Sequence, residues 1–271
     1  MSSPPHATLL PRLGGGAEWL PANAGESGAR VYRRSDGAVF AKCVLADGVP
    51  ELAAERDRVA WLAATDVPCP EYVDWHESAE GACLVTGAVD GVPASEVSVG
   101  AVPRVIASMS DVFRRLHGLP TSDCPFDRRL RVTMPTVEDV VRRGAVDVRN
   151  LEPGQQRTPP IDLLAVLLAE LDRVAGVEAG DLVVCHGDAC LPNVLVDPGT
   201  YECVGLVDLG RLGVADRYLD LSLLHAQLAS PEMNEQFSES DALALLRACG
   251  VANPDHDRLR FYRLLDALSW G

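Results

Sequence analysis

Two short segments of the chain carry polar residues whose types and spacing could perform chemistry. Residues 183–197 contain Asp188 and, five positions later, Asn193. Residues 205–211 contain Asp208, fifteen positions beyond the asparagine. Apolar runs typical of short buried strands flank both aspartates. The pattern therefore predicts that one carboxylate and two further oxygen-bearing side chains lie at the ends of strands.

A carboxylate, an amide and a second carboxylate in this order suit the transfer of a phosphoryl group from a nucleotide to a hydroxyl. Asp188 could orient the attacking hydroxyl and accept its proton. Asn193 and Asp208 would offer oxygen ligands to Mg²⁺, a hard cation that binds a few protein oxygens together with phosphates and water. A His-Gly-Asp sequence alone could be a surface turn, because glycine and aspartate are common there. The ordered triple favours the catalytic interpretation.

A lysine and a glutamate upstream could complete such a site. Lys42 lies in a strand-like run, residues 38–43, from which its ammonium could reach the α- and β-phosphates of ATP. Glu55 belongs to a predicted helix, residues 51–64, and shares one face with apolar residues at intervals of three and four. An inward glutamate needs a cation, so we expect Glu55 to pair with Lys42. Without the downstream triple, a solvated lysine would be the simpler interpretation.

These motifs together resemble those of the aminoglycoside phosphotransferase family of antibiotic-resistance kinases. The segments that carry the resemblance are residues 55–62, 186–193 and 208–220. The resemblance covers nearly the whole chain and implies an α+β, bilobed, protein-kinase-like fold. Residues 1–90 would form a small β-rich lobe that binds nucleotide and includes the hinge, and residues 91–271 a larger, mainly helical lobe with the catalytic loop and the aminoglycoside site. The implied reaction uses ATP and Mg²⁺ to phosphorylate a hydroxyl of the antibiotic.

Details of the sequence favour one branch of that family. Residues 25–28, 80–85, 124–126 and 265–271 are most similar to enzymes that phosphorylate the 3″ hydroxyl of streptomycin. Relatives that act on the 3′ hydroxyl of kanamycin and neomycin end in Leu-Asp-Glu and two aromatic or apolar residues, whereas Ala267 replaces that glutamate here. A 3′-phosphotransferase, a kinase of a small metabolite such as choline or homoserine, and a nucleotide-binding pseudoenzyme stay as alternatives. A pseudoenzyme would require the loss of a catalytic group. All five candidate groups are present, namely Lys42, Glu55, Asp188, Asn193 and Asp208.

The resemblance also implies roles at the nucleotide. Gly25, Ser27 and Gly28 would belong to the nucleotide site, and backbone groups around Gly87 and Val89 would hydrogen-bond the adenine edge. These five positions are expected to act with Lys42 and Glu55.

At the antibiotic, the resemblance places Asp266 and the C-terminal carboxylate of Gly271 beside Asp188. Arg211 could contact either a nucleotide phosphate or a carboxylate, and the residues alone leave both alternatives open. Asp220 is expected to brace the catalytic loop, because carboxylates at the start of a helix commonly accept backbone N–H groups. His186 is expected to order the same loop rather than to transfer a proton.

The apolar pattern predicts the elements that position these residues. Strands are expected near residues 19–20, 30–34, 39–44, 72–76 and 81–86, followed by a break over residues 87–93 that suits a hinge. Two helical stripes follow, and both are expected to be core; they consist of Ile106, Met109, Val112, Phe113 and Leu116, and of Ile161, Leu164, Leu167, Leu168 and Leu171.

Composition excludes several classes of partner. The chain has 271 residues, is 47% hydrophobic and carries a formal charge of −15, so a buried core is expected, a cationic ligand is plausible and nucleic acid is not a partner. Its eight cysteines include no Cys-x-x-Cys pair, which argues against a zinc or redox motif. Neither a signal peptide nor a membrane-spanning run is evident. We therefore expect a cytoplasmic monomer without a membrane partner.

Overall fold

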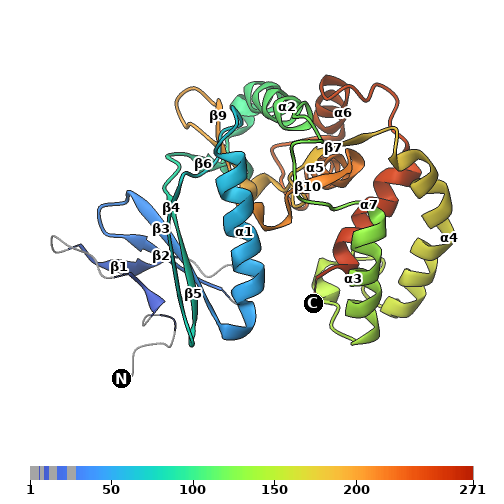
Figure 1. Ribbon diagram of the computed structural model, residues 1–271. Coiled ribbons are helices and arrows are strands. Elements are labelled where there is room, and N and C mark those ends of the chain that lie inside the picture. The colour runs from blue at the N-terminus through green and yellow to red at the C-terminus, as the bar shows by residue number, and fades with distance from the viewer. Residues whose placement is uncertain (1–5, 7–8, 12–16, 23–28, 271) are drawn as a thin grey trace. The chain divides into compact units, whose positions relative to one another are not determined.

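The structure divides into two compact units (Figure 1). It is a computed structural model that describes residues 6, 9–11, 17–22 and 29–270. The first unit comprises Met1–Gly91 with Val204–Gly210, and the second comprises Val92–Cys203 with Arg211–Gly271.

The segment Val204–Gly210 belongs to the first unit, although the sequence suggested a single boundary after residue 90. Two bonds explain its placement. The N–H of Leu206 donates to the carbonyl of Pro68 at 2.9 Å, and Lys42 pairs with Asp208. A linear division of the sequence could not anticipate either bond, because each joins residues that are far apart along the chain.

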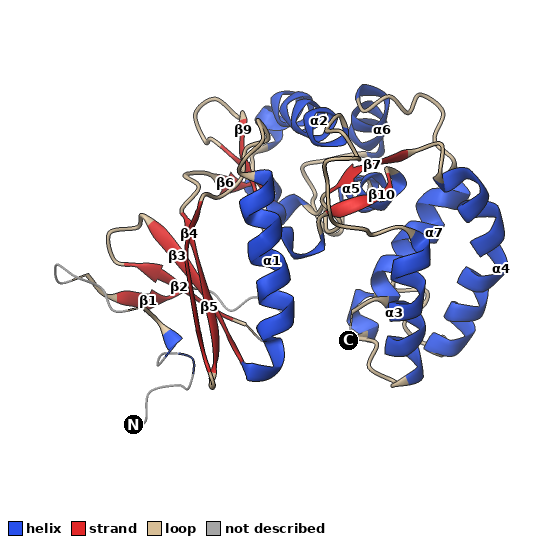
Figure 2. Cartoon of the chain, in the orientation of Figure 1, coloured by secondary structure: helices blue, strands red, loops and turns tan. Residues whose placement is uncertain are grey.

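The first unit is an antiparallel sheet of five strands in the order β1-β2-β3-β5-β4, with one helix against it (Figure 2). Its strands and helix lie within a few residues of the predicted ranges. The elements are β1 (Trp19–Pro21), β2 (Arg30–Arg34), β3 (Val39–Leu45), α1 (Val49–Leu62), β4 (Tyr72–Ser78) and β5 (Gly81–Gly87). A further strand, β9 (Cys203–Leu206), begins at the last residue assigned to the second unit and leads into the returning segment.

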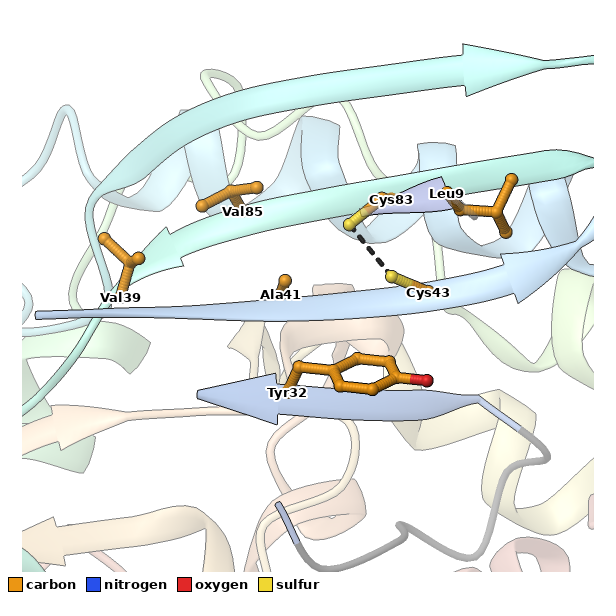
Figure 3. Packing of buried hydrophobic residues seen from close by; sticks show 7 residues of the cluster. All are labelled: Leu9, Tyr32, Val39, Ala41, Cys43, Cys83 and Val85. Atoms are coloured by element: carbon orange, nitrogen blue, oxygen red, sulfur yellow. Dashed lines mark hydrogen bonds between the residues drawn. The ribbon is translucent and has the colours of Figure 1, made fainter. Parts of the chain in front are cut away.

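The sheet of the first unit buries apolar side chains on both faces. Successive residues of β5 point to opposite faces, so Ala82 and Leu84 pack with Leu52 of α1, while Cys83 joins a second cluster (Figure 3). In that cluster Cys43 and Cys83 occupy directly paired positions, and their free thiols approach to 2.9 Å between sulfur atoms. In the same register of β3 against β5, Lys42 lies opposite Leu84.

The second unit is mainly helical, with a few short strands. Its elements are β6 (Val92–Pro93), α2 (Val102–His117), α3 (Leu130–Arg142), α4 (Pro160–Glu178), β7 (Leu182–Cys185), β8 (Val194–Val196), β10 (Gly213–Asp216), α5 (Tyr218–Leu228), α6 (Glu239–Ala248) and α7 (His256–Leu268). β7 pairs antiparallel with β10, and β6 with β8. Helix α7 packs against α3, α4 and α5. Among the described residues, no helix has the length and apolar character needed to cross a bilayer.

One of the two predicted helical stripes is confirmed and the other is corrected. The five stripe residues of α2 are all buried. On α4, Ile161 and Leu168 are 61% and 45% exposed, and the buried residues are Leu163, Leu164, Leu167 and Val174. Helix α4 is apolar on more than one side, so the period of its apolar residues could not identify the face that packs.

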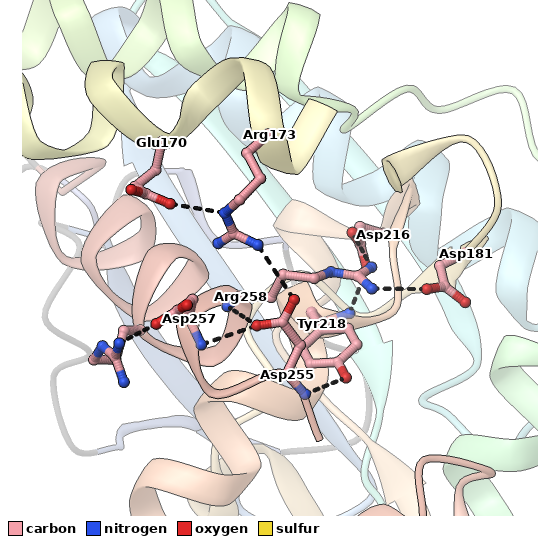
Figure 4. A network of polar contacts seen from close by, with 9 residues as sticks. Glu170, Arg173, Asp181, Asp216, Tyr218, Asp255, Asp257 and Arg258 are labelled. Carbon is pink, nitrogen blue, oxygen red and sulfur yellow. Dashed lines mark hydrogen bonds and ion pairs between the residues drawn. The ribbon is translucent and has the colours of Figure 1, made fainter. Parts of the chain in front are cut away.

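A buried ionic network fastens α7 to β10 in the second unit (Figure 4). The guanidinium of Arg258 donates to Asp216 at 2.5 Å and to Asp181 at 2.9 Å, and it lies over the ring of Tyr218 at 4.0 Å. The side chains of Arg258 and Asp216 are 8% and 0% exposed. Removal of Arg258 would leave the fully buried carboxylate of Asp216 without its counter-charge.

Replacing Arg258 with methionine should therefore lower the free energy of unfolding by about 3–5 kcal/mol. The matched control is Arg260→Met on the same helix, because Arg260 pairs with Asp257 and these side chains are 69% and 60% exposed. The control should cost about 0–1 kcal/mol. Urea unfolding of both variants measures the difference, and equal losses would contradict a stabilising role for the buried pair.

Candidate active site

Lys42, Glu55 and Asp208 meet in the first unit. The ammonium of Lys42, on β3, donates to both carboxylate oxygens of Glu55, on α1, at 3.1 and 2.8 Å, and to Oδ1 of Asp208 at 3.0 Å. Glu55 points inward because it shares a helix face with Leu52 and Val59, which are buried. The predicted pair between Lys42 and Glu55 is confirmed.

Mutual attraction between its charges keeps this cluster ionic despite its burial. Burial alone would lower the pKa of Lys42, but the charges of Glu55 and Asp208 outweigh it and raise the pKa above its ordinary value. Burial raises the pKa of Glu55, and the charge of Lys42 opposes that rise. The side chains of Lys42 and Glu55 are 22% and 12% exposed, so little water screens their attraction. The cluster therefore presents a fixed, charged ammonium.

Asp208 has features that suit a metal ligand. Its backbone has φ 58°, a left-handed conformation that few residues other than glycine adopt and that often marks functional sites. Its side chain is 56% exposed, with one oxygen bonded to Lys42. A half-exposed carboxylate held beside a cation fits the oxygen donor that Mg²⁺ requires beside phosphates.

Other residues predicted to bind nucleotide have mixed outcomes. The N–H of Gly87 donates to the carbonyl of Glu71 at 2.8 Å, so that N–H is already bonded within the sheet. Val89 lies against Gly205, where a Cβ would come within 2.8 Å of the valine side chain. The adenine role stays a prediction at both positions. Gly25, Ser27 and Gly28 lie outside the described residues.

In the second unit, the loop after β7 fixes Asp188. Gly187 has φ 82°, and a Cβ at this position would lie 2.0 Å from the carbonyl oxygen of Arg211, so only glycine fits. The N–H of Asp188 donates to Nδ1 of His186 at 3.2 Å, which confirms that this histidine orders the loop. The amide of Asn193 donates to the backbone oxygen and to Oδ2 of Asp188 at 3.0 and 3.1 Å.

Helix α5 braces this loop at two points. The carboxylate of Asp220 accepts the backbone N–H groups of His186 and Gly187, each at 2.8 Å, which confirms the predicted bracing role. Seven positions further along α5, Oε1 of Gln227 accepts the N–H of Leu191 at 2.8 Å. These three bonds hold the loop on either side of Asp188, so the position of its carboxylate is set largely by backbone contacts with α5.

A second cluster in the same unit gathers Arg211, Asp266 and the end of the chain. Arg211 donates to Asp266 at 3.1 Å and to Oγ of Ser269 at 2.7 Å, and its guanidinium carbon lies 3.5 Å from the ring centre of Trp270. The indole of Trp270 donates to the other oxygen of Asp266 at 3.3 Å. Of the two alternatives for Arg211, the structure shows the contact with a carboxylate.

Asp266 is largely buried, with 13% of its side chain exposed, rather than solvated at a frayed end. Burial raises the pKa of its carboxyl to about 6, while the charge of Arg211 opposes the rise and that of Asp188 adds to it. Asp266 and Asp188 thus influence one another electrostatically. Arg211, Asp266 and Thr133 line the same small pocket. Gly271 lies outside the described residues.

The structure thus brings together Lys42, Glu55 and Asp208 in one unit, and Asp188, Asn193, Arg211 and Asp266 in the other. Sequence reasoning missed His117, which bonds to Asp220 at 3.0 Å, and Gln227. These residues contact the loop system across 103 and 36 positions of sequence. No local motif marks either of them, so only the fold could reveal their contacts.

Comparison with known proteins agrees with this geometry. Residues 18–262 match the phosphotransferase enzyme family. The chain is 46% identical to a streptomycin 3″-kinase of Streptomyces griseus over 98% of both chains, and 39% identical to an aminoglycoside 3′-phosphotransferase of Streptomyces fradiae over 92% of this chain and 94% of that one. A solved aminoglycoside phosphotransferase, APH(3″)-Id of Streptomyces rimosus in complex with ADP and streptomycin, superposes with a TM-score of 0.87 at 44% identity over 95% of each chain.

The chain belongs to the phosphotransferase enzyme family, as an aminoglycoside phosphotransferase with the α+β, protein-kinase-like fold. This confirms the family and the fold expected from the sequence.

Replacing Glu55 with glutamine should raise KM for ATP about ten- to a hundredfold, because a charge-assisted bond that fixes Lys42 is worth about 1.5–3 kcal/mol. Steady-state kinetics with varied ATP measure the effect. Asp57→Asn is the matched control on α1, since Asp57 is 55% exposed and pairs with Arg56 at the surface. If KM for ATP were unchanged in Glu55→Gln, the hypothesis that Glu55 positions Lys42 for nucleotide binding would be wrong.

Proposed function

We propose that the protein phosphorylates the 3″ hydroxyl of streptomycin with ATP and Mg²⁺ and so confers resistance to this antibiotic. The observation that carries the reaction type is the fixed Asp188 carboxylate, whose Oδ2 is held by Asn193 and whose backbone is held by His186. The substrate is supported by the likeness to a streptomycin 3″-kinase along nearly the whole chain. The formal charge of −15 also suits a cationic substrate.

In this reaction Asp188 orients the hydroxyl and takes its proton. The hydroxyl oxygen forms a bond to the γ-phosphorus while the bond from that phosphorus to the bridging oxygen breaks, and ADP leaves with the electron pair. Lys42, held by Glu55, contacts the α- and β-phosphates. Asn193 and Asp208 carry the oxygens that would hold Mg²⁺, which neutralises phosphate charge when it is bound.

The substrate site is proposed to include Asp266 and the C-terminal carboxylate of Gly271. Streptomycin carries two guanidinium groups, and a guanidinium pairs with a carboxylate through two parallel hydrogen bonds. The bond from the guanidinium of Arg211 to Oδ1 of Asp266 at 3.1 Å supports this proposal, because the carboxylate already has a guanidinium as a partner. Ala267 is only 6% exposed, so the position that holds a glutamate in the 3′ enzymes offers no charged contact here.

We also propose that the enzyme acts as a monomer in the cytoplasm. ATP is available there, and the reducing conditions suit its eight free cysteines.

A panel of streptomycin, kanamycin, neomycin and choline in an ATP-consumption assay tests the proposed substrate. Turnover of kanamycin alone would indicate a 3′ enzyme, turnover of choline alone a metabolite kinase, and no turnover a pseudoenzyme.

Replacing Asp188 with alanine should lower kcat by about two to four orders of magnitude, the usual effect of losing a general base, with little change in ATP affinity. The control is Asp197→Ala, because Asp197 accepts N–H groups of Gly199 and Thr200 in an exposed turn. Single-turnover kinetics separate chemistry from binding. Nearly full turnover in Asp188→Ala would exclude Asp188 from the reaction.

Replacing Asp266 with asparagine should raise KM for streptomycin more than it lowers kcat, because a charged partner is lost. In the wild type, protonation of Asp266 as pH falls through about 6 should raise the same KM, since only the ionised carboxylate attracts a cation. The variant should lose that dependence. Asp257→Asn, also on α7 and 60% exposed, is the control. Identical pH profiles of KM in both proteins would place the streptomycin cation elsewhere.

A further inference from the structure

A buried histidine touches the brace of the catalytic loop. Nε2 of His117, at the end of α2, lies 3.0 Å from Oδ2 of Asp220, and the two side chains are 7% and 0% exposed. The same Oδ2 accepts the N–H of His186, and Oδ1 accepts the N–H of Gly187. A carboxylate oxygen only accepts hydrogen bonds when it is ionised, so Nε2 of His117 must carry the hydrogen that it donates.

The bond to Asp220 is the polar interaction that explains a histidine at this position. Nδ1 of His117 is buried and has no hydrogen-bond partner among the described residues. The ring packs edge-on against Phe113, with the ring centres 5.9 Å apart. An apolar residue would avoid the unsatisfied nitrogen. The packing therefore fixes the ring of His117, and the hydrogen bond from Nε2 to Asp220 is its polar interaction in the described structure.

The contact leads to the reacting group in two steps. Asp220 fixes the backbone of His186 and Gly187, and these residues immediately precede Asp188. The N–H of Asp188 then donates to the ring of His186. A rotation of the Asp220 carboxylate would release both amides, and the general base would lose its fixed position.

A metal site at the same place is a poorer explanation. His117, Cys185 and Asp220 lie close enough to share an ion. However, Sγ of Cys185 donates to the carbonyl of Asp216 at 3.4 Å, and burial raises the pKa of its thiol well above the ordinary value. A metal ligand must be a thiolate. The oxygens of Asp220 are already bonded to three N–H groups, so the cluster is closed by its own hydrogen bonds.

We propose that His117 is a positioning residue for phosphoryl transfer. By donating from Nε2 to Asp220, it holds the carboxylate that fixes the peptide before Asp188, and so holds the general base against the substrate hydroxyl. The proposal rests on the proposed kinase activity for its catalytic consequence, but the effect on the loop backbone is independent of that activity.

The test compares three substitutions at one position. Glutamine extends an amide N–H to about the place of Nε2, asparagine is too short to reach it, and leucine has no donor. His117→Leu and His117→Asn should lower kcat about ten- to a hundredfold, the effect of losing one hydrogen bond to a charged group, with KM for ATP changed less than about twofold. His117→Gln should stay within about threefold of the wild-type kcat.

Ser110→Ala provides the matched control. Ser110 is buried on α2, seven positions before His117, and its hydroxyl donates only to the carbonyl of Ile106 within the same helix in the described structure. This variant loses a buried polar group of α2 without touching Asp220, so its kcat should equal that of the wild type. Thermal unfolding of all variants reports whether each one is folded.

Amide hydrogen exchange supplies a readout that does not need turnover. The amides of His186 and Gly187 should exchange faster in His117→Leu and His117→Asn than in the wild type, and at the wild-type rate in His117→Gln and Ser110→Ala. If the wild type phosphorylates none of the compounds, the proposed function fails while the exchange rates still decide the role of His117. If His117→Leu does not fold, the glutamine and asparagine variants decide it.

Equal kcat values in His117→Gln and His117→Asn would overturn the proposal. So would slow exchange of both amides in His117→Asn, or a loss of kcat in Ser110→Ala as large as that in His117→Asn.

Discussion

A carboxylate without access to water must be surrounded by hydrogen-bond donors, and this constraint shapes the second unit. Asp220 is fully buried and draws two backbone N–H groups and a histidine ring toward it. The loop that carries Asp188 follows the positions of those donors. Together with Gly187, whose positive φ only glycine tolerates here, these bonds turn the loop after β7 into a rigid support for a proton acceptor.

The same principle recurs at the other charged sites, with different partners. In the first unit Glu55 fixes Lys42, and Asp208 completes the cluster. In the second unit Arg211 joins Asp266 to the end of the chain, with Trp270 against its guanidinium. Each unit therefore organises its own polar groups internally. The groups suited to phosphates belong to one unit, and the group suited to a proton belongs to the other.

The local part of this organisation could be predicted from the sequence. Short apolar runs located the strands of the first unit and a helical pattern its helix, and the spacing of Asp188, Asn193 and Asp208 indicated the chemistry. Glu55 was placed correctly because its helix face is set by neighbours in the same helix. The predicted packing face of α4 was wrong in part. That helix has apolar residues on several sides, and its partner α7 lies far along the chain.

Contacts between distant segments were beyond prediction for a related reason. The side chains of His117 and Gln227 carry no motif, and their partners become neighbours only when α2 packs against β7 and the loop after β7 bonds to α5. The free N–H groups of a loop can be satisfied by any acceptor that the fold brings near. Likewise, the bond of Gly87 to Glu71 joins β5 to the residue before β4, so the occupied N–H could not be foreseen.

The burial of Ala267 limits how this enzyme could evolve. Ala267 is 6% exposed, in a stretch of α7 where Leu264, Leu265 and Leu268 are also buried. A glutamate at this position would place a charge in this buried stretch, next to Asp266, whose own ionisation is already disfavoured by burial. A change of antibiotic through this position would need accompanying substitutions in the surrounding helices. A variant that carried the glutamate alone would therefore be less stable than the present protein.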